Sequence, residues 1–347
     1  GDRVSVYASN CPEYVDLFWA AGKIGFVLHN LNWRLTVHEL QQIVLDAEPV
    51  VLLYSDDWAD QVEQLRPSFT TIREVVAFGE PLDGDRPFAE RDSFPTELGP
   101  RPDLGLDDIW GIYYTGGTTG LPKGAILTHG NLTWNSVNTI TSWGLTADHV
   151  APLQLPFFHI GGPNIFMVPL VHLGGTTILC EGFDLDESYD LIEKGGITHY
   201  VAVPTMYQML QAHPRWEEAD FSKMALVISG GAPCPVPIMQ KFWDRGIDFK
   251  MGYGLTEASG NNFLFQLLGV EKTKVVAGGS DMMGAMQAVA DELIREGRKP
   301  YIIPGGGSNP VGATGYVAGA EEILAQTFDM GLNISRVICA SGSTGTH

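Results

Sequence analysis

Short apolar runs alternate with longer amphipathic segments along most of the chain. The runs Val4–Ala8 and Val50–Tyr54 are typical of buried strands, the second of a strand in a parallel sheet. The segment Pro12–Ile24 predicts a helix, because proline is favoured in the first helical turn. The residues Thr36-Val37-His38-Glu39 form a capping box and predict a second helix start. This alternation predicts an α/β fold with largely parallel sheets and flanking helices.

The same alternation continues toward the C-terminus. Residues 80–107 are rich in Pro, Asp and Gly and indicate a surface connection. A stripe of apolar residues recurs at helical spacing between residues 282 and 293, which favours a helix facing the core over a cofactor site. The stripe consists of Met282, Met286, Val289 and Leu293. Further strands are expected at Trp110–Tyr114, Thr176–Leu179, His199–Val203, Ala225–Ser229, Tyr301–Pro304 and Arg336–Ala340.

Composition narrows the class of protein. The chain has 347 residues, 44% of them hydrophobic, and a formal net charge of −20. This length suits one large domain or two ordinary ones, and the negative charge argues against nucleic acid and anionic membranes as partners. No apolar stretch approaches the length of a membrane span. Four separated cysteines without a CxxC pair indicate buried thiols in a reducing compartment, so we expect a cytoplasmic protein.

The first stretch with clear chemistry is the Gly/Thr-rich sequence from Tyr114 to Gly124, which follows an expected strand. Its glycines allow successive N–H groups to point at phosphate oxygens. Thr118 and Thr119 offer hydroxyl groups, and Lys123 offers a compact cation. The spacing differs from the Walker sequence G-x-x-x-x-G-K-[ST], which excludes an ordinary P-loop NTPase. Taken alone, the stretch could also be a glycine-rich surface turn.

Three further motifs follow along the chain. They are Pro156-Phe157-Phe158-His159-Ile160-Gly161-Gly162, Ser229-Gly230-Gly231-Ala232-Pro233 and Gly252-Tyr253-Gly254-Leu255-Thr256-Glu257. Together with the Gly/Thr loop they resemble, in order and spacing, the adenylate-forming superfamily of acyl- and aryl-CoA synthetases, luciferases and nonribosomal adenylation domains. The segments Asn10–Tyr14 and Leu31–Thr36 also resemble the N-terminal half of that superfamily. The resemblance covers residues 1–262 and implies a truncated large N-terminal domain.

The resemblance implies ATP-dependent activation of a carboxylic acid, in which the carboxylate attacks the α-phosphate of ATP and pyrophosphate leaves. Thr256 would contact the α-phosphate or the acid, Glu257 would bind Mg²⁺, and His159 would lie at the acid pocket. Tyr253 and Gly254 would border adenine. The adenine-side loop would be Gly230, Gly231, Ala232 and Pro233, and the phosphate contacts would be Thr115, Gly116, Gly117, Thr118, Thr119, Gly120 and Lys123. Coenzyme A would serve as the acceptor of an acid–CoA ligase.

Several of these residues also have a structural interpretation. His159 follows two phenylalanines and could be a core histidine, and Tyr253 could be an ordinary core aromatic. Glu257 could be an acid stabilised by a helix N-terminus. An apolar run suggests an acyl pocket for a fatty or aryl acid, although apolar runs usually indicate core. The run consists of Phe157, Phe158, Ile165, Phe166 and Met167.

The C-terminal part carries a different resemblance. Residues 299–309, 312–316 and 340–347 resemble D-cysteine desulfhydrase and aminocyclopropane-carboxylate deaminase, which are pyridoxal-phosphate (PLP) enzymes of fold type II. The resemblance implies a phosphate-binding loop made of Gly342, Ser343, Thr344, Gly345 and Thr346. The Gly-Gly-Asn-Lys context of the Schiff-base lysine is absent from this sequence, which argues against PLP as a working cofactor. The chain is therefore interpreted as a chimera of two fragments, residues 1–262 and 263–347.

Three functional hypotheses remain. The first is acid adenylation that is partial or impaired, because the family's ribose-binding Thr-Gly-Asp motif and its C-terminal catalytic lysine are missing. The second is a chimera that binds ATP or AMP without turnover. The third is a PLP-dependent D-cysteine desulfhydrase, which the missing lysine opposes. The expected partners are ATP and a small carboxylic acid, and the oligomeric state stays open.

Overall fold

The computed structural model describes residues 1–97, 103–116, 122–264 and 281–300. By its internal contacts the chain divides into two units, Gly1–Thr273 and Lys274–His347. Within the second unit the structure describes helix α9 (Met282–Arg295). The helix expected from the apolar stripe is therefore confirmed, with Met286, Val289 and Leu293 half-buried. The strands expected at Tyr301–Pro304 and Arg336–Ala340 lie outside the described residues.

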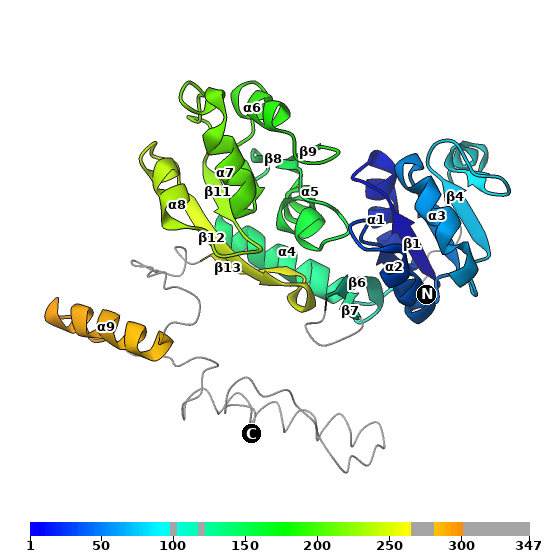
Figure 1. The fold of residues 1–347 in the computed structure, drawn as a ribbon, viewed down its shortest axis with the longest axis horizontal. Coiled ribbons are helices and arrows are strands. Elements are labelled where there is room, and N and C mark those ends of the chain that lie inside the picture. The colour runs from blue at the N-terminus through cyan, green and yellow to red at the C-terminus, as the bar shows by residue number, and fades with distance from the viewer. Residues whose placement is uncertain (98–102, 117–121, 265–280, 301–347) are drawn as a thin grey trace, which may run out of the picture. The chain divides into compact units, whose positions relative to one another are not determined.

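A seven-stranded sheet forms the N-terminal part of the first unit (Figure 1). Its strand order is β5-β4-β3-β1-β2-β6-β7, and all pairs are parallel except β6–β7. The strands are β1 (Arg3–Tyr7), β2 (Val27–Asn30), β3 (Val51–Tyr54), β4 (Glu74–Ala77), β5 (Arg86–Pro87), β6 (Ile109–Thr115) and β7 (Lys123–Thr128). The connecting helices are α1 (Pro12–Ile24), α2 (Val37–Ala47) and α3 (Ala59–Leu65), with short 3₁₀ turns at Asp56–Trp58, Arg66–Ser68 and Phe88–Ser93.

Two smaller sheets complete the first unit. One has the order β10-β11-β12-β13, in which only β12–β13 is antiparallel, and the other is the parallel pair β8–β9. Their strands are β8 (Val150–Leu153), β9 (Thr176–Leu179), β10 (His199–Ala202), β11 (Leu226–Ser229), β12 (Phe249–Leu255) and β13 (Gly260–Leu264). The helices are α4 (His129–Trp143), α5 (Val168–Leu173), α6 (Leu185–Glu193), α7 (Pro204–Ala212) and α8 (Val236–Trp243), with a π-helix at Pro163–Met167 and 3₁₀ turns at Pro214–Trp216 and Thr256–Ala258. Helix α4 links the two parts of the first unit along the chain (Figure 1).

Local sequence signals account for the helix ends. Helix α1 spans Pro12–Ile24, as expected, and ends at Gly25 in the left-handed conformation (φ 79°). The capping box of α2 is also confirmed, because the Glu39 N–H donates to Thr36 Oγ1 and the Thr36 N–H donates to Glu39 Oε2. The expected α/β fold with largely parallel sheets is therefore confirmed.

One hydrophobic core connects the large sheet to the smaller ones. It joins Val6 and Leu28 of the large sheet to Leu153 of β8 and Ile228 of β11. Phe18 of α1 packs against Trp110 of β6, with ring centroids 4.5 Å apart. Because this core is shared, the segments that leave the ends of β8 and β11 are held against the N-terminal sheet.

The structure also corrects the sequence interpretation. Lys123 and Gly124, expected in a loop, begin strand β7, which pairs antiparallel with β6. Residues 80–107, expected as a surface connection, are mostly exposed where the structure describes them and also contain the short strand β5. The strands β2, β4 and β8 were not expected, because their short runs include Asn30, Glu74 and Pro152, residue types that are depleted in strands.

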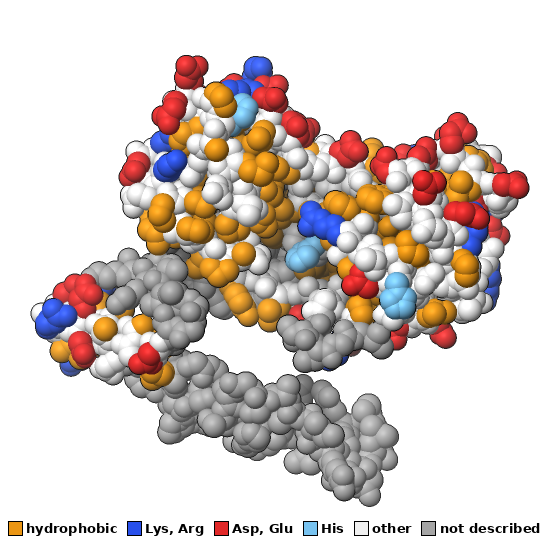
Figure 2. Space-filling model, in the orientation of Figure 1, with side chains coloured by type: hydrophobic (Ala, Val, Ile, Leu, Met, Phe, Trp, Pro, Cys, Tyr) orange, Lys and Arg blue, Asp and Glu red, His pale blue; other side chains and the backbone are white. Residues whose placement is uncertain are grey.

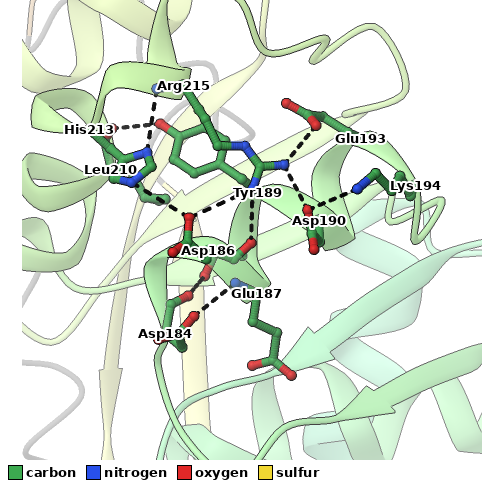
Figure 3. Close-up of polar contacts among 11 residues, drawn as sticks. Asp184, Asp186, Glu187, Tyr189, Asp190, Glu193, Lys194, Leu210, His213 and Arg215 are labelled. Atoms are coloured by element: carbon green, nitrogen blue, oxygen red, sulfur yellow. Dashed lines mark hydrogen bonds and ion pairs between the residues drawn. The ribbon is translucent and has the colours of Figure 1, made fainter.

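An ion-pair network joins helix α6 to the 3₁₀ turn after α7 (Figure 3). The Arg215 guanidinium donates to Asp190 and Glu193 at 2.8 and 2.7 Å, and it lies over the Tyr189 ring. The Tyr189 hydroxyl donates to the carbonyl of Leu210 at 2.6 Å. In Figure 2, acidic side chains gather over the end of the molecule that carries α6 and over the end that carries α3, while hydrophobic side chains cover much of the face below α6.

Two further expectations concern the cysteines and membrane spans. Cys180 and Cys234 are buried free thiols, as expected, whereas Cys11 is half-buried. Burial raises the pKa of Cys180 to about 12, so this side chain is a thiol at neutral pH. No helix in the described part of the chain is long and apolar enough to cross a membrane.

Candidate active site

A cavity of about 520 Å³ lies where the N-terminal part meets the smaller sheets. Two motifs that are far apart in sequence border it, the His159 segment and the Gly230–Gly231 pair. Its other walls are mostly apolar. The lining residues are Asn10, Trp33, Arg34, Gln154, Leu155, Pro156, Phe158, His159, Gly161, Ile165, Glu181, Gly182, Phe183, Val201, Ala202, Val203, Met206, Gly230 and Gly231.

An aromatic wall carries a cation on one side of this cavity. The Arg34 guanidinium carbon lies 5.0 Å from the Trp33 ring centroid and 5.6 Å from that of Phe158. Trp33 in turn stacks on Trp58, with ring centroids 5.3 Å apart. Stacking on aromatic faces suits a guanidinium because it is planar and weakly hydrated. Among the described residues Arg34 makes no ion pair, so its charge is available to an anion in the cavity.

His159 lies in the cavity wall and is not a core residue. Its side chain is accessible to solvent, although many surrounding wall atoms restrict its hydration. Burial, with a smaller contribution from the nearby Arg34 charge, lowers its pKa below the ordinary histidine value. The Gly161 N–H donates to His159 Nδ1 at 3.2 Å. A neutral ring that accepts at Nδ1 carries its proton on Nε2, so His159 can offer one N–H donor.

A single buried side chain holds the segment that leads to His159. Asn10, only 5% exposed, donates to the carbonyls of Leu153 and Leu155 and accepts from the Phe157 N–H at 2.8 Å. The turn that follows closes tightly, because a Cβ on Gly162 would lie 2.4 Å from the Pro156 carbonyl oxygen. These contacts explain how the motif presents Phe158 and His159 to the cavity.

The apolar run near this motif divides between cavity and core. Phe158 and Ile165 line the cavity. Phe157, Phe166 and Met167 are each 1% exposed and belong to the hydrophobic core. The expectation that all five residues form an acyl pocket is therefore wrong for these three, since they face the shared core.

The adenine-side motif follows strand β11. Gly230 and Gly231 line the cavity, and Gly231 has a positive φ of 76°. Ala232 and Pro233 are exposed and do not line it. The glycine pair thus brings the backbone to the cavity, while the next two residues lead away to helix α8.

The third motif forms the end of β12 and the turn after it. Tyr253 is 46% exposed, so it is not an ordinary core aromatic, and Glu257 is exposed in the first turn of a 3₁₀ helix. Gly254 has a steric role, because an added Cβ would lie 1.9 Å from the Gly260 carbonyl oxygen on β13. Neither Tyr253 nor the Thr256–Glu257 pair lines the cavity that holds His159.

The Gly/Thr loop is described only at its base. Thr115 pairs with Lys123 across the β6–β7 ladder, and the Thr115 hydroxyl donates to the Lys123 carbonyl at 3.4 Å. Gly116 and Lys123 are exposed. Gly117, Thr118, Thr119 and Gly120 lie outside the described residues, as do Gly342, Ser343, Thr344, Gly345 and Thr346.

The described residues can be tested against the ligands that the sequence suggests. No group of three metal-ligating side chains occurs within the described residues, whereas Glu257 is a single exposed carboxylate. Mg²⁺ is commonly bound through one or two carboxylates together with substrate phosphates and water, so Glu257 fits a magnesium ion that arrives with ATP. No lysine lines the 520 Å³ cavity, so the cavity does not fit PLP, which needs an amine beside the cofactor.

Sequence reasoning missed several lining residues. Arg34 and Asn10 lie in segments noted for their resemblance, but nothing in the sequence assigned them to the cavity. Met206 lies in the first turn of α7, and no sequence motif marks it as a cavity residue. The cavity was not predictable because its walls come from β10, from α7 and from the segments that follow β1, β2, β8, β9 and β11.

Comparison with known proteins gives a consistent result. The sequence model of the family described as "AMP-binding enzyme" matches residues 1–293. Feruloyl-CoA synthase of an Amycolatopsis species is 39% identical over 75% of this chain and 50% of that protein. Indoleacetate–CoA ligase of Aromatoleum aromaticum is 34% identical over 73% of this chain and 50% of that protein. The solved N-terminal domain of FACL13 from Mycobacterium tuberculosis superposes with a TM-score of 0.68 and 28% identity, covering 76% of this chain and 65% of that one.

These similarities place the chain in a class. It belongs to the AMP-binding enzyme family and carries the α/β fold of that family's N-terminal domain. The chain spans about half the length of the two curated relatives named here.

Proposed function

We propose that this chain binds ATP and an aromatic carboxylic acid and supports acyl-adenylate formation, the first step of an acid–CoA ligase. The observation that carries the proposal is the cavity itself, because the His159 segment and the Gly230–Gly231 pair line the same 520 Å³ space. Both segments had been assigned to this reaction from sequence, one to the acid side and one to the adenine side. Membership of the AMP-binding enzyme family supports the same chemistry.

The cavity walls favour an aromatic acid. Trp33, Phe158 and Phe183 line the cavity, and flat rings pack well against aromatic side chains. The names of two relatives, feruloyl-CoA synthase and indoleacetate–CoA ligase, also refer to aromatic acids. A volume of about 520 Å³ falls within the usual range for small-molecule sites.

Individual residues have distinct proposed roles. The neutral ring of His159 donates a hydrogen bond from its Nε2–H to the substrate carboxylate, and this bond orients the carboxylate. Lys123 and the loop Thr115–Gly120 bind the β- and γ-phosphates, and Thr256 contacts the α-phosphate. Tyr253 and Gly254 border adenine with the Gly230–Pro233 loop. Bound Mg²⁺, held by Glu257, would neutralise charge on the phosphates. Coenzyme A is the proposed acceptor in the complete enzyme.

Acid-dependent exchange of ATP with labelled pyrophosphate tests the proposal directly. We expect exchange with ferulate or indoleacetate exceeding that with octanoate, and its loss in both Lys123→Ala and Glu257→Ala. An exposed lysine outside the site, Lys223, provides the matched control Lys223→Ala, which should retain full exchange. If ATP binds but no acid supports exchange, the chain is a nucleotide-binding module.

The C-terminal segment supports a second, separate proposal. We propose that residues 263–347 derive from a PLP enzyme of fold type II, on sequence resemblance alone, and that they bind no PLP because the Schiff-base lysine is missing. The family match extends to residue 293, past the proposed junction at 262. After incubation with PLP and removal of the free cofactor by dialysis, no aldimine absorbance band should remain near the visible edge, and D-cysteine should release no sulfide. An aldimine band that survives dialysis would contradict this proposal.

A further inference from the structure

Three asparagines surround the turn that follows Thr256 and Glu257. They are Asn135 on α4, Asn164 in the π-helix and Asn261 on β13. The Asn164 side-chain amide donates to the Ser259 carbonyl at 3.0 Å. The Asn135 amide donates to the carbonyls of Ala258 and Asn261 at 3.1 and 2.7 Å. The three asparagines are named here the asparagine cluster, and through these contacts they bind the carbonyls of Ala258, Ser259 and Asn261.

The third member of the cluster, Asn261, donates from β13 back to α4 and to the π-helix. Its side-chain amide donates to Thr139 Oγ1 on α4 at 3.2 Å and to the Asn164 carbonyl at 3.3 Å. The Ile165 carbonyl lies 3.5 Å from the same nitrogen. Residue 169 is a proline and has no N–H, which removes the i+5 donor for the Asn164 carbonyl and the i+4 donor for the Ile165 carbonyl. The side chain of Asn261 therefore replaces a backbone donor that the helix lacks.

The turn held by this cluster has an uncommon backbone. Ser259 is not a glycine, yet its φ is +62°, and it is almost fully buried. Its N–H donates to the Thr256 carbonyl at 3.0 Å, which closes the short helix that carries Glu257. A left-handed serine is unfavourable in isolation, so external contacts must stabilise it. The Asn164 contact to the Ser259 carbonyl is one of them.

The backbone of Asn164 is connected to the segment that lines the cavity. The Asn164 N–H donates to the Ile160 carbonyl at 3.1 Å, and the Gly162 N–H donates to the His159 carbonyl at 2.8 Å. His159 and Asn164 are thus joined by one short hydrogen-bonded segment. Asn164 is 2% exposed, so water does not compete for its contacts.

We infer that Asn164 is a positioning residue that sets the Thr256–Glu257 turn relative to the His159 segment. This inference rests on the proposed function, in which His159 holds the acid and Glu257 the nucleotide-bound magnesium. Asn164 touches neither group and acts through the Ser259 carbonyl. In-line attack requires the two substrates to be held at a fixed spacing, which a rigid connection between their binding segments supplies.

The connection itself can be tested without any ligand. Hydrogen exchange of the ligand-free full chain should be faster in Asn164→Ala than in the wild type, both in residues 160–168 and in residues 256–261. Exposed Asn138 on α4 has no side-chain hydrogen bond to the described residues, so Asn138→Ala is the matched control and should leave both segments unchanged. Faster exchange in one segment only, or in neither, overturns the connection.

The positioning role needs a second measurement. The dissociation constant of α,β-methylene-ATP with Mg²⁺ is measured by calorimetry with and without saturating ferulate, well below the unfolding temperature. In the wild type, ferulate should lower the dissociation constant of the nucleotide analogue, an effect called tightening here. The positioning role predicts that the factor of this tightening is at least about fivefold smaller in Asn164→Ala. A purely structural role predicts a lower melting temperature with the same tightening, and that result overturns the inference.

Two outcomes separate this inference from the proposed function. If the wild type binds neither nucleotide nor ferulate, the proposed function and the positioning role both fail, while the exchange result still decides whether the connection exists. If Asn164→Ala does not fold, half-buried Asn135 provides Asn135→Ala, which removes the contacts to Ala258 and Asn261. The same loss of tightening is expected there, and unaltered tightening overturns the inference.

Discussion

Two regions of the first unit attach neighbouring segments to one another by polar side chains, and they do so in different ways. The α6 region uses charges near the surface: Arg215 pairs with Asp190 and Glu193, and the side chain of Asp190 is 54% exposed (Figure 3). The cavity region uses neutral amides in the interior, namely Asn10 and Asn164, at 5% and 2% exposure.

This difference in environment has a physical consequence. Water and salt screen a surface ion pair, and ordering two long side chains offsets much of the gain. A buried amide competes with no water, and removing it leaves buried backbone groups unpaired. We therefore expect the α6 contacts to tolerate change and the cavity contacts to be sensitive to it.

The largest effect is expected where the backbones themselves approach. In Gly254→Ala the added methyl would lie 1.9 Å from the Gly260 carbonyl oxygen, so β12 and β13 must separate. We expect a loss of about 3 kcal/mol in the free energy of unfolding, measured with urea. Gly230→Ala is the control, because its nearest neighbour would be the Gly252 carbonyl oxygen at 3.9 Å. Similar losses in both variants would show that strand separation is not the cause.

The next effect concerns the buried amide beside the cavity. Asn10→Ala leaves two carbonyls and the Phe157 N–H without their partner. We expect a loss of about 2 kcal/mol in the free energy of unfolding, together with weaker ferulate binding. Asn138→Ala, which removes an exposed amide, should change neither. Normal ferulate affinity in Asn10→Ala would mean that Asn10 does not hold the His159 segment.

Acid should lower the free energy of unfolding because two histidines are buried in their neutral form. Burial, with nearby Arg3 as a smaller cause, lowers the pKa of His29 to about 3, and burial, with His149, lowers that of His199 to about 3. Below the ordinary value near 6.5 the unfolded chain binds protons that the folded chain does not. Stability therefore falls as pH decreases from 6.5 toward 3.

The expected slope is at most about 1.4 kcal/mol per pH unit for each histidine. Urea unfolding at pH 7.5 and pH 5 measures it. His199→Gln should reduce the difference between the two pH values, whereas His38→Gln, an exposed control, should not. Equal differences in wild type and His199→Gln would rule out this residue as a source.

The smallest effect is expected at the surface network. Arg215→Ala removes the pairs to Asp190 and Glu193 and the contact over Tyr189. The loss of stability should be smaller than that of Asn10→Ala, and it should shrink as salt rises tenfold, to about 0.5 M. Thermal unfolding of both variants at the two salt concentrations measures it. A loss that is insensitive to salt would indicate packing of the arginine stem on Tyr189 as its source.

Local signals determined much of the fold from the sequence alone. The proline and Gly25 that bound α1 and the Thr36–Glu39 capping box act within a few residues, so the sequence contains the whole interaction. The apolar runs at β1 and β3 indicated buried strands, the second of them in a parallel sheet, for the same reason. The motifs around His159, Gly230 and Glu257 indicated adenylate-forming chemistry, and the family match agrees with them.

Only the tertiary structure decided which of these residues meet. Asn10 contacts the carbonyl of Leu153, 143 positions away, and Asn164 contacts that of Ser259, 95 positions away. The same apolar run supplies Phe158 to the cavity and Phe157 to the core, because consecutive side chains of one turn face opposite sides. Such pairings depend on how sheets and helices pack across the shared core, and no short-range pattern encodes them. The sequence thus specified several of the helices and strands and the chemical class, and packing specified the cavity and the contacts that hold it.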